Sequence, residues 1–266
     1  MCLIAWRWQP GTATPLLLLA NRDEFYARPT VPLRWWPGGR VLAGQDLQAG
    51  GTWLGLGAGG RRLAALTNFR DPGLLPSAAA AGAAQPPSRG ALVSEFLQDE
   101  SLSAADYLAQ LAPRAAEFQG FNLLLFDGQQ LLGFEGRASR GHRSVVLEPG
   151  LGAVSNAGFD TPWPKLLTLK SALAQRLAED HAEPGGDEAL LALLRDPRIA
   201  PDESLPATGV PLDWERALSA IFIATPNYGT RASALLRLRQ QGGFDFLERS
   251  FDASGVIGMR EFRVVA

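Results

Sequence analysis

The alternation of short strand patterns with helical patterns is the feature that most constrains this fold. Short apolar runs separated by Gly, Pro and Asn turns occupy the first 70 residues, and similar runs return after residue 120 and near the C-terminus. Leucines at helical spacing fill the regions between these blocks. This order predicts an α+β chain. We expect a four-layer αββα sandwich of two mainly antiparallel sheets, formed as a single domain by residues 1–266.

The individual elements follow from the same patterns. The predicted helices cover 89–98, 104–118, 162–179 and 187–195, and Pro113 is expected to kink or split the second of them. The predicted strands cover 3–8, 16–20, 41–44, 52–56, 62–68, 121–126, 130–135, 144–147, 152–154, 219–224, 232–239, 243–251 and 260–265. The prolines of 29–37 favour extended or looped chain, 71–87 is expected to form a long surface loop, and 197–212 is expected to be irregular.

Charge and hydropathy exclude several classes of protein. The 25 Lys and Arg residues and 27 Asp and Glu residues give a net charge of −2, and no block of one sign occurs. This balance argues against nucleic acid and anionic membranes as partners. The longest apolar runs, such as 16–20, fall far short of the roughly 20 residues of a membrane span. The N-terminal segment lacks the pattern of a signal peptide, so we expect a soluble, cytoplasmic protein.

The cysteine and histidine counts limit the chemistry further. Cys2 is the single cysteine, so neither an internal disulfide nor a cysteine-based zinc site can form. The two histidines, His142 and His181, lie in polar stretches typical of the protein surface. A Ser-His-Asp relay or a metal site would have to use one of them. We therefore expect neither a metal nor a resident cofactor.

The position of Cys2 offers a nucleophile that needs no histidine. Initiator methionine is commonly removed before a small residue, which would leave Cys2 with a free α-amine beside its thiol. The reference pKa of an α-amine is ~7.7–8.0, so part of it is neutral near physiological pH and can accept the thiol proton. Retention of Met1 would remove this base. The alternative is that Cys2 is a small apolar residue at the start of a strand, since free cysteines are often buried.

A polar segment, Asn21–Glu24, follows the second predicted strand. One interpretation is a turn, because Asn and Asp favour turns. If the first two strands instead pair as a hairpin, the segment lies at the same end of the sheet as Cys2. A cation such as Arg22 would then lower the pKa of the thiol, and a carboxylate such as Asp23 could hold the α-amine. Neighbouring strand residues face opposite sides of a sheet, so at most one of Arg22 and Asp23 points at Cys2. Asn21 or Glu24 could take the same part instead.

Two asparagines and a late arginine are further candidates. Asn68 ends the strand 62–68 and Asn156 follows the strand 152–154. Each is either a turn or cap residue, or an amide that donates to an oxyanion. Arg231, in the segment 228–231, either belongs to a hairpin turn or reaches into a cleft to bind a carboxylate or amide.

Taken together, six segments resemble those of the NRDE-motif family, whose eukaryotic branch is called transport and Golgi organisation protein 2: Met1–Ile4, Asn21–Glu24, Gly50–Gly55, Ala65–Arg70, Ser155–Ala157 and Tyr228–Arg231. The resemblance implies a fold similar to that of the Ntn (N-terminal nucleophile) hydrolases, especially the penicillin V acylase and bile-salt hydrolase group. By that likeness Cys2 is the nucleophile, Asn68 and Asn156 are oxyanion and positioning amides, and Arg231 is the late arginine. Arg22 and Asp23 correspond to an Arg and an Asp that those hydrolases space three residues apart, whereas here they are adjacent.

Two functions follow from this resemblance. The first is an Ntn-type hydrolase or amidase that acts on a small acylated substrate through Cys2. The second is a binding or trafficking protein on the same fold that carries haem or a lipid-like acyl ligand, since members of the family have been linked to both. The tryptophans of the first fifth of the chain would suit such a ligand pocket or, alternatively, the core: Trp6, Trp8, Trp35, Trp36 and Trp53.

Overall fold

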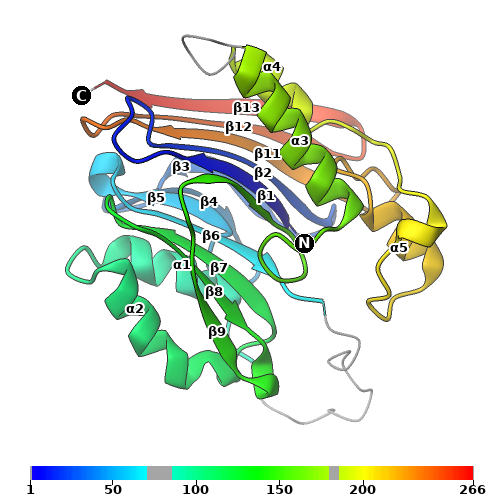
Figure 1. Ribbon diagram of the computed structural model, residues 1–266, viewed down its shortest axis with the longest axis horizontal. Coiled ribbons are helices and arrows are strands. Elements are labelled where there is room, and N and C mark those ends of the chain that lie inside the picture. The colour runs from blue at the N-terminus through cyan, green and yellow to red at the C-terminus, as the bar shows by residue number, and fades with distance from the viewer. Residues whose placement is uncertain (1, 71–85, 180–185, 266) are drawn as a thin grey trace.

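Two antiparallel sheets form the centre of the molecule (Figure 1). The computed structural model describes residues 2–70, 86–179 and 186–265. The six-stranded sheet A contains, in spatial order, β10 (Gly150–Val154), β1 (Cys2–Trp8), β2 (Leu16–Phe25), β11 (Tyr228–Leu238), β12 (Phe244–Asp252) and β13 (Gly255–Val264). The seven-stranded sheet B contains β3 (Thr30–Trp35), β4 (Val41–Asp46), β5 (Leu54–Gly57), β6 (Leu63–Asn68), β7 (Phe121–Phe126), β8 (Leu131–Gly136) and β9 (His142–Val146).

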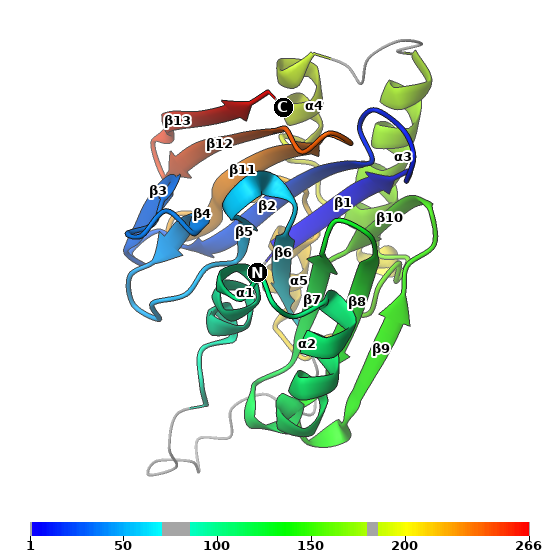
Figure 2. The same cartoon turned by 90° about the vertical axis from the view of Figure 1, so that its left-hand side faces the viewer.

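Helices cover the outer face of each sheet (Figures 1 and 2). The helices α1 (Arg89–Gln98) and α2 (Ala104–Leu111) pack with sheet B around a core that includes Phe96. The helices α3 (Pro164–Glu179) and α4 (Asp187–Leu193) pack with sheet A around a core that includes Leu169. A third core, which includes Trp6, lies between the two sheets. Each sheet is therefore apolar on both faces, and the predicted αββα layering is confirmed.

The polar segment Asn21–Glu24 belongs to a strand, which corrects the prediction that the strand ends at Ala20. β2 continues to Phe25 because its backbone pairs with β1 on one side and with β11 on the other. Its polar side chains have buried partners. Asn21 donates to the carbonyl oxygens of Leu194 and Ile221 at 2.9 and 2.8 Å and accepts from the Ser233 hydroxyl. These long-range bonds compensate the burial of a polar strand.

The predicted strand 219–224 and the hairpin-turn interpretation of 228–231 are both wrong. The backbone of Ile221 and Phe222 bonds elsewhere, since Ile221 accepts from Asn21 and the Phe222 amide donates to Asp196. Ile223 and Ala224 meet the backbone of β11 through just one hydrogen bond from the Thr230 amide and an isolated bridge to Gly229. Tyr228–Arg231 instead begins β11, which pairs with β2. The register shifts between Thr230 and Ala232, so Arg231 is the extra residue of a β-bulge. Such bulges redirect a side chain relative to its strand.

The remaining differences are local. The second predicted helix stops at Leu111 and continues as a 3-10 turn, Ala112–Glu117, so the predicted interruption at Pro113 is confirmed. The prolines of 29–37 allow the edge strand β3, which has a register shift between Val31 and Arg34. Short 3-10 turns occur at Ala58–Gly60, Ala138–Arg140 and Asp202–Ser204. Most of the predicted loop 71–87 lies outside the described residues.

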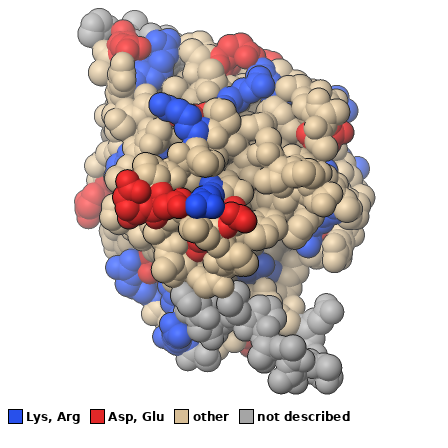
Figure 3. All heavy atoms as spheres, turned by 90° about the vertical axis from the view of Figure 1, so that its right-hand side faces the viewer, with Lys and Arg blue, Asp and Glu red and all other residues tan. Residues whose placement is uncertain are grey.

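A fifth helix, α5 (Leu212–Leu218), was not predicted and follows the proline-rich segment. Its Arg216 forms ion pairs with Asp202 and Asp213 at 2.6 and 2.9 Å. Figure 3 shows acidic and basic side chains next to one another on this side of the molecule. Among the described residues, no helix combines the length and apolar character that a membrane crossing requires.

Candidate active site

A cleft of about 830 Å³ opens between the two sheets at the N-terminal end of β1. Five of the six predicted site residues line it, and they come from strands that are distant in sequence: Cys2, Arg22, Asp23, Asn68 and Arg231. Other charged residues that line the cleft are Glu24, Arg28, Asp46, Arg89 and Glu248. The lining is therefore rich in both signs of charge.

Cys2 is the first residue of β1 and is 6% exposed. Its backbone carbonyl accepts a hydrogen bond from the Ser155 hydroxyl at 3.2 Å, which ties β1 to the end of β10. Burial raises the pKa of the Cys2 thiol, Asp23 adds to this rise, and Arg22 opposes it. The thiol is consequently protonated at neutral pH, and a reaction at its sulfur requires a base.

Arg22 is the residue of the polar segment that shares a sheet face with Cys2. The two are direct cross-strand partners in the β1–β2 register, and such partners project from the same face. The Arg22 Nη2 donates to Asp46 Oδ2 at 3.2 Å, and Arg28 Nε donates to the same oxygen at 2.6 Å. Burial by itself would raise the pKa of Asp46, but hydrogen bonds from Arg28 and the Ala49 amide lower it overall. An ionised Asp46 thus fixes the guanidinium of Arg22.

Asp23 projects from the opposite face of β2, as its alternation with Arg22 requires. It is 1% exposed, and its Oδ1 accepts from the Thr230 hydroxyl at 2.8 Å. Burial raises the pKa of Asp23, while the positive charge of Lys165 is the largest influence that lowers it. The Asp23 carboxylate is therefore buried at the end of the sheet where β1 begins, and the Thr230 hydroxyl and the positive charge of Lys165 partly compensate the cost of burying it.

Asn68 and Asn156 occupy different positions. Asn68 ends β6, is half-buried and lines the cleft. Asn156 is fully buried and is not among the residues that line the cleft. Its Nδ2 donates to the Asn68 carbonyl at 2.9 Å, and its own carbonyl accepts from the Arg70 amide at 2.8 Å. Asn156 therefore holds the backbone on both sides of Phe69, and only Asn68 faces the cleft.

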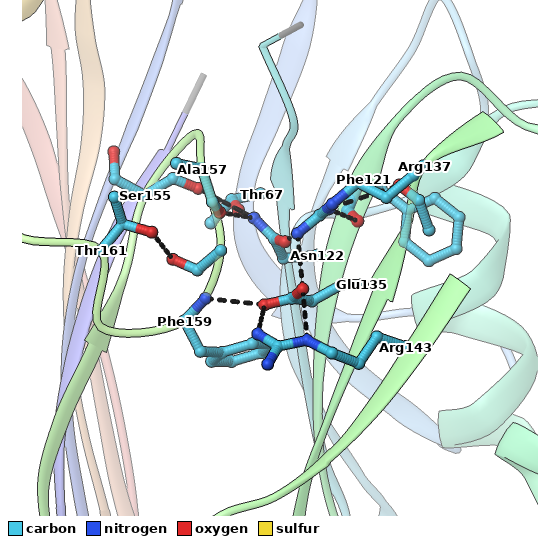
Figure 4. Close-up of polar contacts among 12 residues, drawn as sticks. Thr67, Phe121, Asn122, Glu135, Arg137, Arg143, Ser155, Ala157, Phe159 and Thr161 are labelled. Carbon is cyan, nitrogen blue, oxygen red and sulfur yellow. Dashed lines mark hydrogen bonds and ion pairs between the residues drawn. The ribbon is translucent and has the colours of Figure 1, made fainter. Parts of the chain in front are cut away.

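Asn122 is a positioning residue that the sequence analysis did not identify (Figure 4). It lies on β7 and is 1% exposed. Its Nδ2 donates to the carbonyl oxygens of Ser155 and Ala157 at 3.2 and 2.7 Å, and the Thr67 hydroxyl also donates to Ser155. These bonds hold the segment that contains Asn156 against sheet B. An asparagine inside an otherwise apolar strand was the available signal in the sequence.

Glu135 on β8 extends the same network (Figure 4). Its carboxylate accepts from the Phe159 amide at 2.9 Å and from Arg143 at 2.7 and 2.9 Å, and it lies 2.8 Å from Arg137. Burial would raise the pKa of Glu135, but hydrogen bonds from Arg143 and the Phe159 amide lower it overall. The ionised carboxylate fixes the segment that follows Asn156.

Arg231 makes its contacts with the backbone. Its Nη1 donates to the carbonyl oxygens of Phe25, Tyr26 and Arg28 at 2.9, 3.1 and 3.1 Å. Its Nε donates to the Phe251 carbonyl at 3.2 Å. The bulge directs this guanidinium toward the chain that leaves β2. Arg231 thereby stabilises the wall of the cleft that carries the polar segment.

Glu248 and Arg89 are two further cleft residues that the sequence analysis did not identify. Glu248 Oε1 accepts from the Leu33 amide at 2.7 Å, and burial raises the pKa of Glu248 to about 7. Arg89 is the first residue of α1, and its Nη1 donates to the Gly120 carbonyl at 3.1 Å. Neither residue belongs to a motif that a single sequence reveals.

The tryptophans and His142 lie mostly away from the cleft. Trp53 lines it, whereas Trp6 and Trp8 are buried in the core between the sheets. Trp36 packs against the core of sheet B, and Trp35 is exposed. His142 is the first residue of β9 and stacks on Phe134 of β8, and His181 is outside the described residues. The described lining therefore offers haem no histidine ligand. Over the same part of the chain, no group of three His, Cys, Asp or Glu side chains is arranged to hold a metal ion.

Comparison with known proteins gives consistent matches over nearly the whole chain. The sequence profile of the family described as "Transport and Golgi organisation 2" matches residues 1–253. A transport and Golgi organization protein 2 homolog of Bos taurus is 33% identical over 270 residues, which cover 94% of this chain and 93% of the relative. The Homo sapiens homolog is 32% identical over the same shares of the two chains. The Drosophila melanogaster protein is 27% identical over 264 residues, covering 91% and 88%.

Solved structures were matched as well. One of them is a Caenorhabditis elegans N-acylethanolamine-hydrolyzing acid amidase ortholog, with a TM-score of 0.47 and 10% sequence identity. The match covers 73% of this chain and 85% of that one.

Proposed function

The chain belongs to the Transport and Golgi organisation 2 family, and within that family we propose that this protein is an N-terminal-nucleophile hydrolase. Its substrate is a small acylated compound whose amide or ester bond is cleaved. The observation that carries the proposal is the position of Cys2, the single cysteine, on the wall of a cleft of about 830 Å³. That volume suits a small-molecule substrate, since ligand pockets span roughly 300–1,000 Å³.

The base for this reaction is the α-amine of Cys2 itself. Burial raises the pKa of the thiol, so the sulfur needs a neighbouring group that takes its proton. His142, the histidine within the described residues, is not among those that line the cleft. Removal of Met1 would create an amine on the same residue as the thiol. The proposal therefore requires Cys2 to be the first residue of the mature chain.

The reaction proceeds in two halves. The α-amine takes the thiol proton, and the thiolate attacks the carbonyl carbon to form a tetrahedral oxyanion. The oxyanion collapses as the C–N or C–O bond breaks, and the ammonium gives its proton to the leaving amine or alcohol, which leaves a thioester on Cys2. Water then attacks the thioester and loses a proton to the amine. Collapse of the second tetrahedral species releases the carboxylic acid and restores the thiol.

Asn68 and Arg22 have distinct parts in this scheme. Asn68 faces the cleft, and its Nδ2 is the proposed oxyanion donor, a role worth roughly 2.7–4 kcal/mol where it has been measured. Asn156 contributes by holding the Asn68 backbone. Arg22 shares the sheet face of Cys2, so its positive charge favours the thiolate.

Mass and reactivity measurements test the proposal. The intact mass of the native protein reports whether Met1 is absent. A panel of short-chain acyl p-nitroanilides and p-nitrophenyl esters then measures hydrolysis, and a thioester on Cys2 would add the acyl mass. We expect Cys2→Ala to abolish acylation and to reduce hydrolysis by several orders of magnitude, as removal of a nucleophile does. Retained Met1, or hydrolysis that survives in Cys2→Ala, would overturn the proposal.

A second candidate is the carriage of an acyl or haem ligand without chemistry. The cleft volume and the contribution of Trp53, Phe251 and Ile257 to its lining favour this candidate. Under this alternative, Cys2→Ala leaves ligand affinity largely unchanged, because a carrier needs no nucleophile. Titration of wild type and Cys2→Ala with a fatty-acyl ligand and with haem separates the two functions.

A further inference from the structure

Glu248 is a buried carboxyl on the wall of the cleft. It lies within β12 and is 4% exposed. Its Oε1 accepts from the Leu33 amide at 2.7 Å, whereas its Oε2 has no hydrogen bond to any group within residues 2–70, 86–179 and 186–265. A buried ionised carboxylate is costly unless hydrogen bonds and an opposite charge compensate it. One oxygen of Glu248 is therefore available to a bound molecule.

Neither cation near Glu248 pairs with it. Arg22 on β2 donates to Asp46 at 3.2 Å. Arg260 is the direct partner of Glu248 on β13, but its side chain is exposed and no ion pair joins the two in the described part of the chain. Burial raises the pKa of Glu248 to about 7, and the Leu33 amide and Arg22 oppose that rise only in part. Among the described residues, Glu248 thus has no paired counter-charge.

The fold does not require the charge of Glu248. The amide oxygen of a glutamine would accept from Leu33 as well, and it would avoid the cost of burying a charge. Because burial raises the pKa of Glu248, its ionisation lowers the stability of the folded state. A titratable group that is kept in a cleft at a cost in stability is typical of a binding or catalytic site.

Cys2 and Glu248 face the same side of sheet A from different ends of the cleft. Direct cross-strand partners share a face, and one row of them leads across the sheet: Cys2, Arg22, Ala232 and Ser250. Glu248 precedes Ser250 by two residues, so its side chain projects from that face as well. Three spacings between neighbouring strands separate β1 from β12 (Figure 2), which amounts to roughly 14 Å.

The strands beside Glu248 add apolar side chains to the lining of the cleft. They come from β3, β11 and β13: Val31, Pro32, Ala232 and Ile257. Gly44 on β4 lines the cleft next to the free oxygen of Glu248, since a Cβ at position 44 would lie 3.4 Å from Oε2. A methylene chain suits this lining, and a polar group at its end would meet the carboxyl.

We propose that Glu248 determines substrate specificity, because its carboxylate binds a primary ammonium at the end of an acyl chain whose carbonyl carbon lies at Cys2. This inference rests on the proposed function and names its substrate class, the amides and esters of ω-amino acids. The ammonium donates to Oε2 while Oε1 keeps its bond from Leu33. A charge-assisted hydrogen bond is roughly twice as strong as a neutral one, so the contact selects an amine over a hydroxyl or an alkyl end.

Binding of the reaction products tests the inference without any hydrolysis. The ligands are ω-amino carboxylic acids of increasing chain length, each compared with the ω-hydroxy acid and the alkanoic acid of equal length. Calorimetric titration of the full chain gives the dissociation constants. We expect the amino acid to bind about tenfold to a hundredfold more tightly than either analogue, as a hydrogen bond between charged groups allows. The preference should be largest at the length that reaches from Cys2 to Glu248.

Two variants isolate the charge. Glu248→Gln keeps the bond from Leu33 and removes the charge, so the preference for the amine should fall to about twofold or less. Arg260→Met is the matched control, because Arg260 is the cross-strand partner of Glu248 and is not among the residues that line the cleft. The control should keep the preference of wild type.

The pH dependence of the preference is a further readout. In wild type it should rise as pH increases through about 7, because only the ionised form of Glu248 binds an ammonium strongly, and in Glu248→Gln it should stay flat. Three other charged groups face Glu248: Arg22, Asp46 and Arg260. None of them titrates near pH 7, because arginine stays protonated and because burial of Asp46 is outweighed by hydrogen bonds that lower its pKa.

The outcomes separate this inference from the hydrolase proposal. Equal binding of the amino acid and its two analogues overturns the inference, and so does a preference that survives in Glu248→Gln. Hydrolysis of ω-aminoacyl p-nitroanilides is then compared with that of the matched alkanoyl compounds. If the products show the preference while no hydrolysis depends on Cys2, the hydrolase proposal fails and the ammonium site stands. If hydrolysis depends on Cys2 and neither products nor substrates show the preference, the reverse holds.

Discussion

Replacement of Asn122 by Ala tests whether the polar network between the sheets positions the candidate active site. The side chain donates to the carbonyl oxygens of Ser155 and Ala157 and accepts from Arg137 at 3.1 Å. Ser155 in turn donates to the backbone of Cys2. The variant removes these bonds in a region where water cannot readily replace them, because Asn122 is 1% exposed.

The expected magnitude follows from the number of groups left without partners. A buried polar group that loses its hydrogen bond costs about 1–3 kcal/mol. The Ser155 carbonyl keeps its bond from Thr67, and Ala157 is half-buried, so the free energy of unfolding should fall by about 2–4 kcal/mol in total. For a chain of this size that corresponds to a decrease in Tm of roughly 5–15 °C.

Thermal unfolding and hydrogen exchange provide the assay. The exposed Ser144 on β9 gives a control, since Ser144→Ala should leave Tm unchanged. Amide exchange in Asn122→Ala should accelerate over 153–161 and at Arg70, while α2 keeps its protection. A Tm within about 2 °C of wild type would refute the reasoning. So would a lower Tm with no local change in exchange, because the destabilisation would then not arise from the segment that contains Asn156.

Two further predictions concern the cleft. A Cβ at position 51 would lie 2.3 Å from the backbone carbon of Gly90, so Gly51→Ala should displace α1 and lower the free energy of unfolding by about 1–3 kcal/mol in a denaturant titration. Gly258→Ala is the control and should have no effect, because a Cβ at position 258 would have no atom within 4 Å. Equal stability of the two variants would contradict this prediction. The pKa of Glu248 is raised from an ordinary 4.5 to about 7, so the folded state binds more protons between these values and this group lowers stability as pH rises through the window. Glu248→Gln keeps the oxygen that accepts from Leu33 and should raise Tm above about pH 7 while having little effect below pH ~4; an equal change in Tm at both ends of the range would show that ionisation of Glu248 is not the cause.

Where local patterns and tertiary packing agree, the sequence is a sufficient guide. The predicted helix over 89–98 coincides with α1, because its apolar positions face sheet B and two prolines, Pro86 and Pro87, precede it. The predicted strand over 121–126 coincides with β7 for the same reason. The four-layer arrangement also followed from the order of strand and helix patterns. In these regions one buried face and a local turn or cap settle the conformation.

The predictions failed where polar residues are buried by distant partners. Asn21 and Asp23 suggest a turn when only their neighbours are considered. In the fold, Asn21 donates to a carbonyl 200 residues away, and Asp23 accepts from Thr230. Tyr228–Arg231 also resembled a turn, but it pairs with β2 and contains a bulge at Arg231. No local pattern contains these partners.

The sequence by itself determined the layer order, most helix and strand positions, and the residue types gathered in six short segments. It also identified Cys2 as the single thiol and limited the histidine chemistry. Only the tertiary structure decided that Arg22 shares a face with Cys2, and that Asn68 faces the cleft while Asn156 holds its backbone. The physical reason is that hydrophobic periodicity is a property of neighbouring residues, whereas strand register and the compensation of buried polar groups depend on partners that folding brings together from distant parts of the chain.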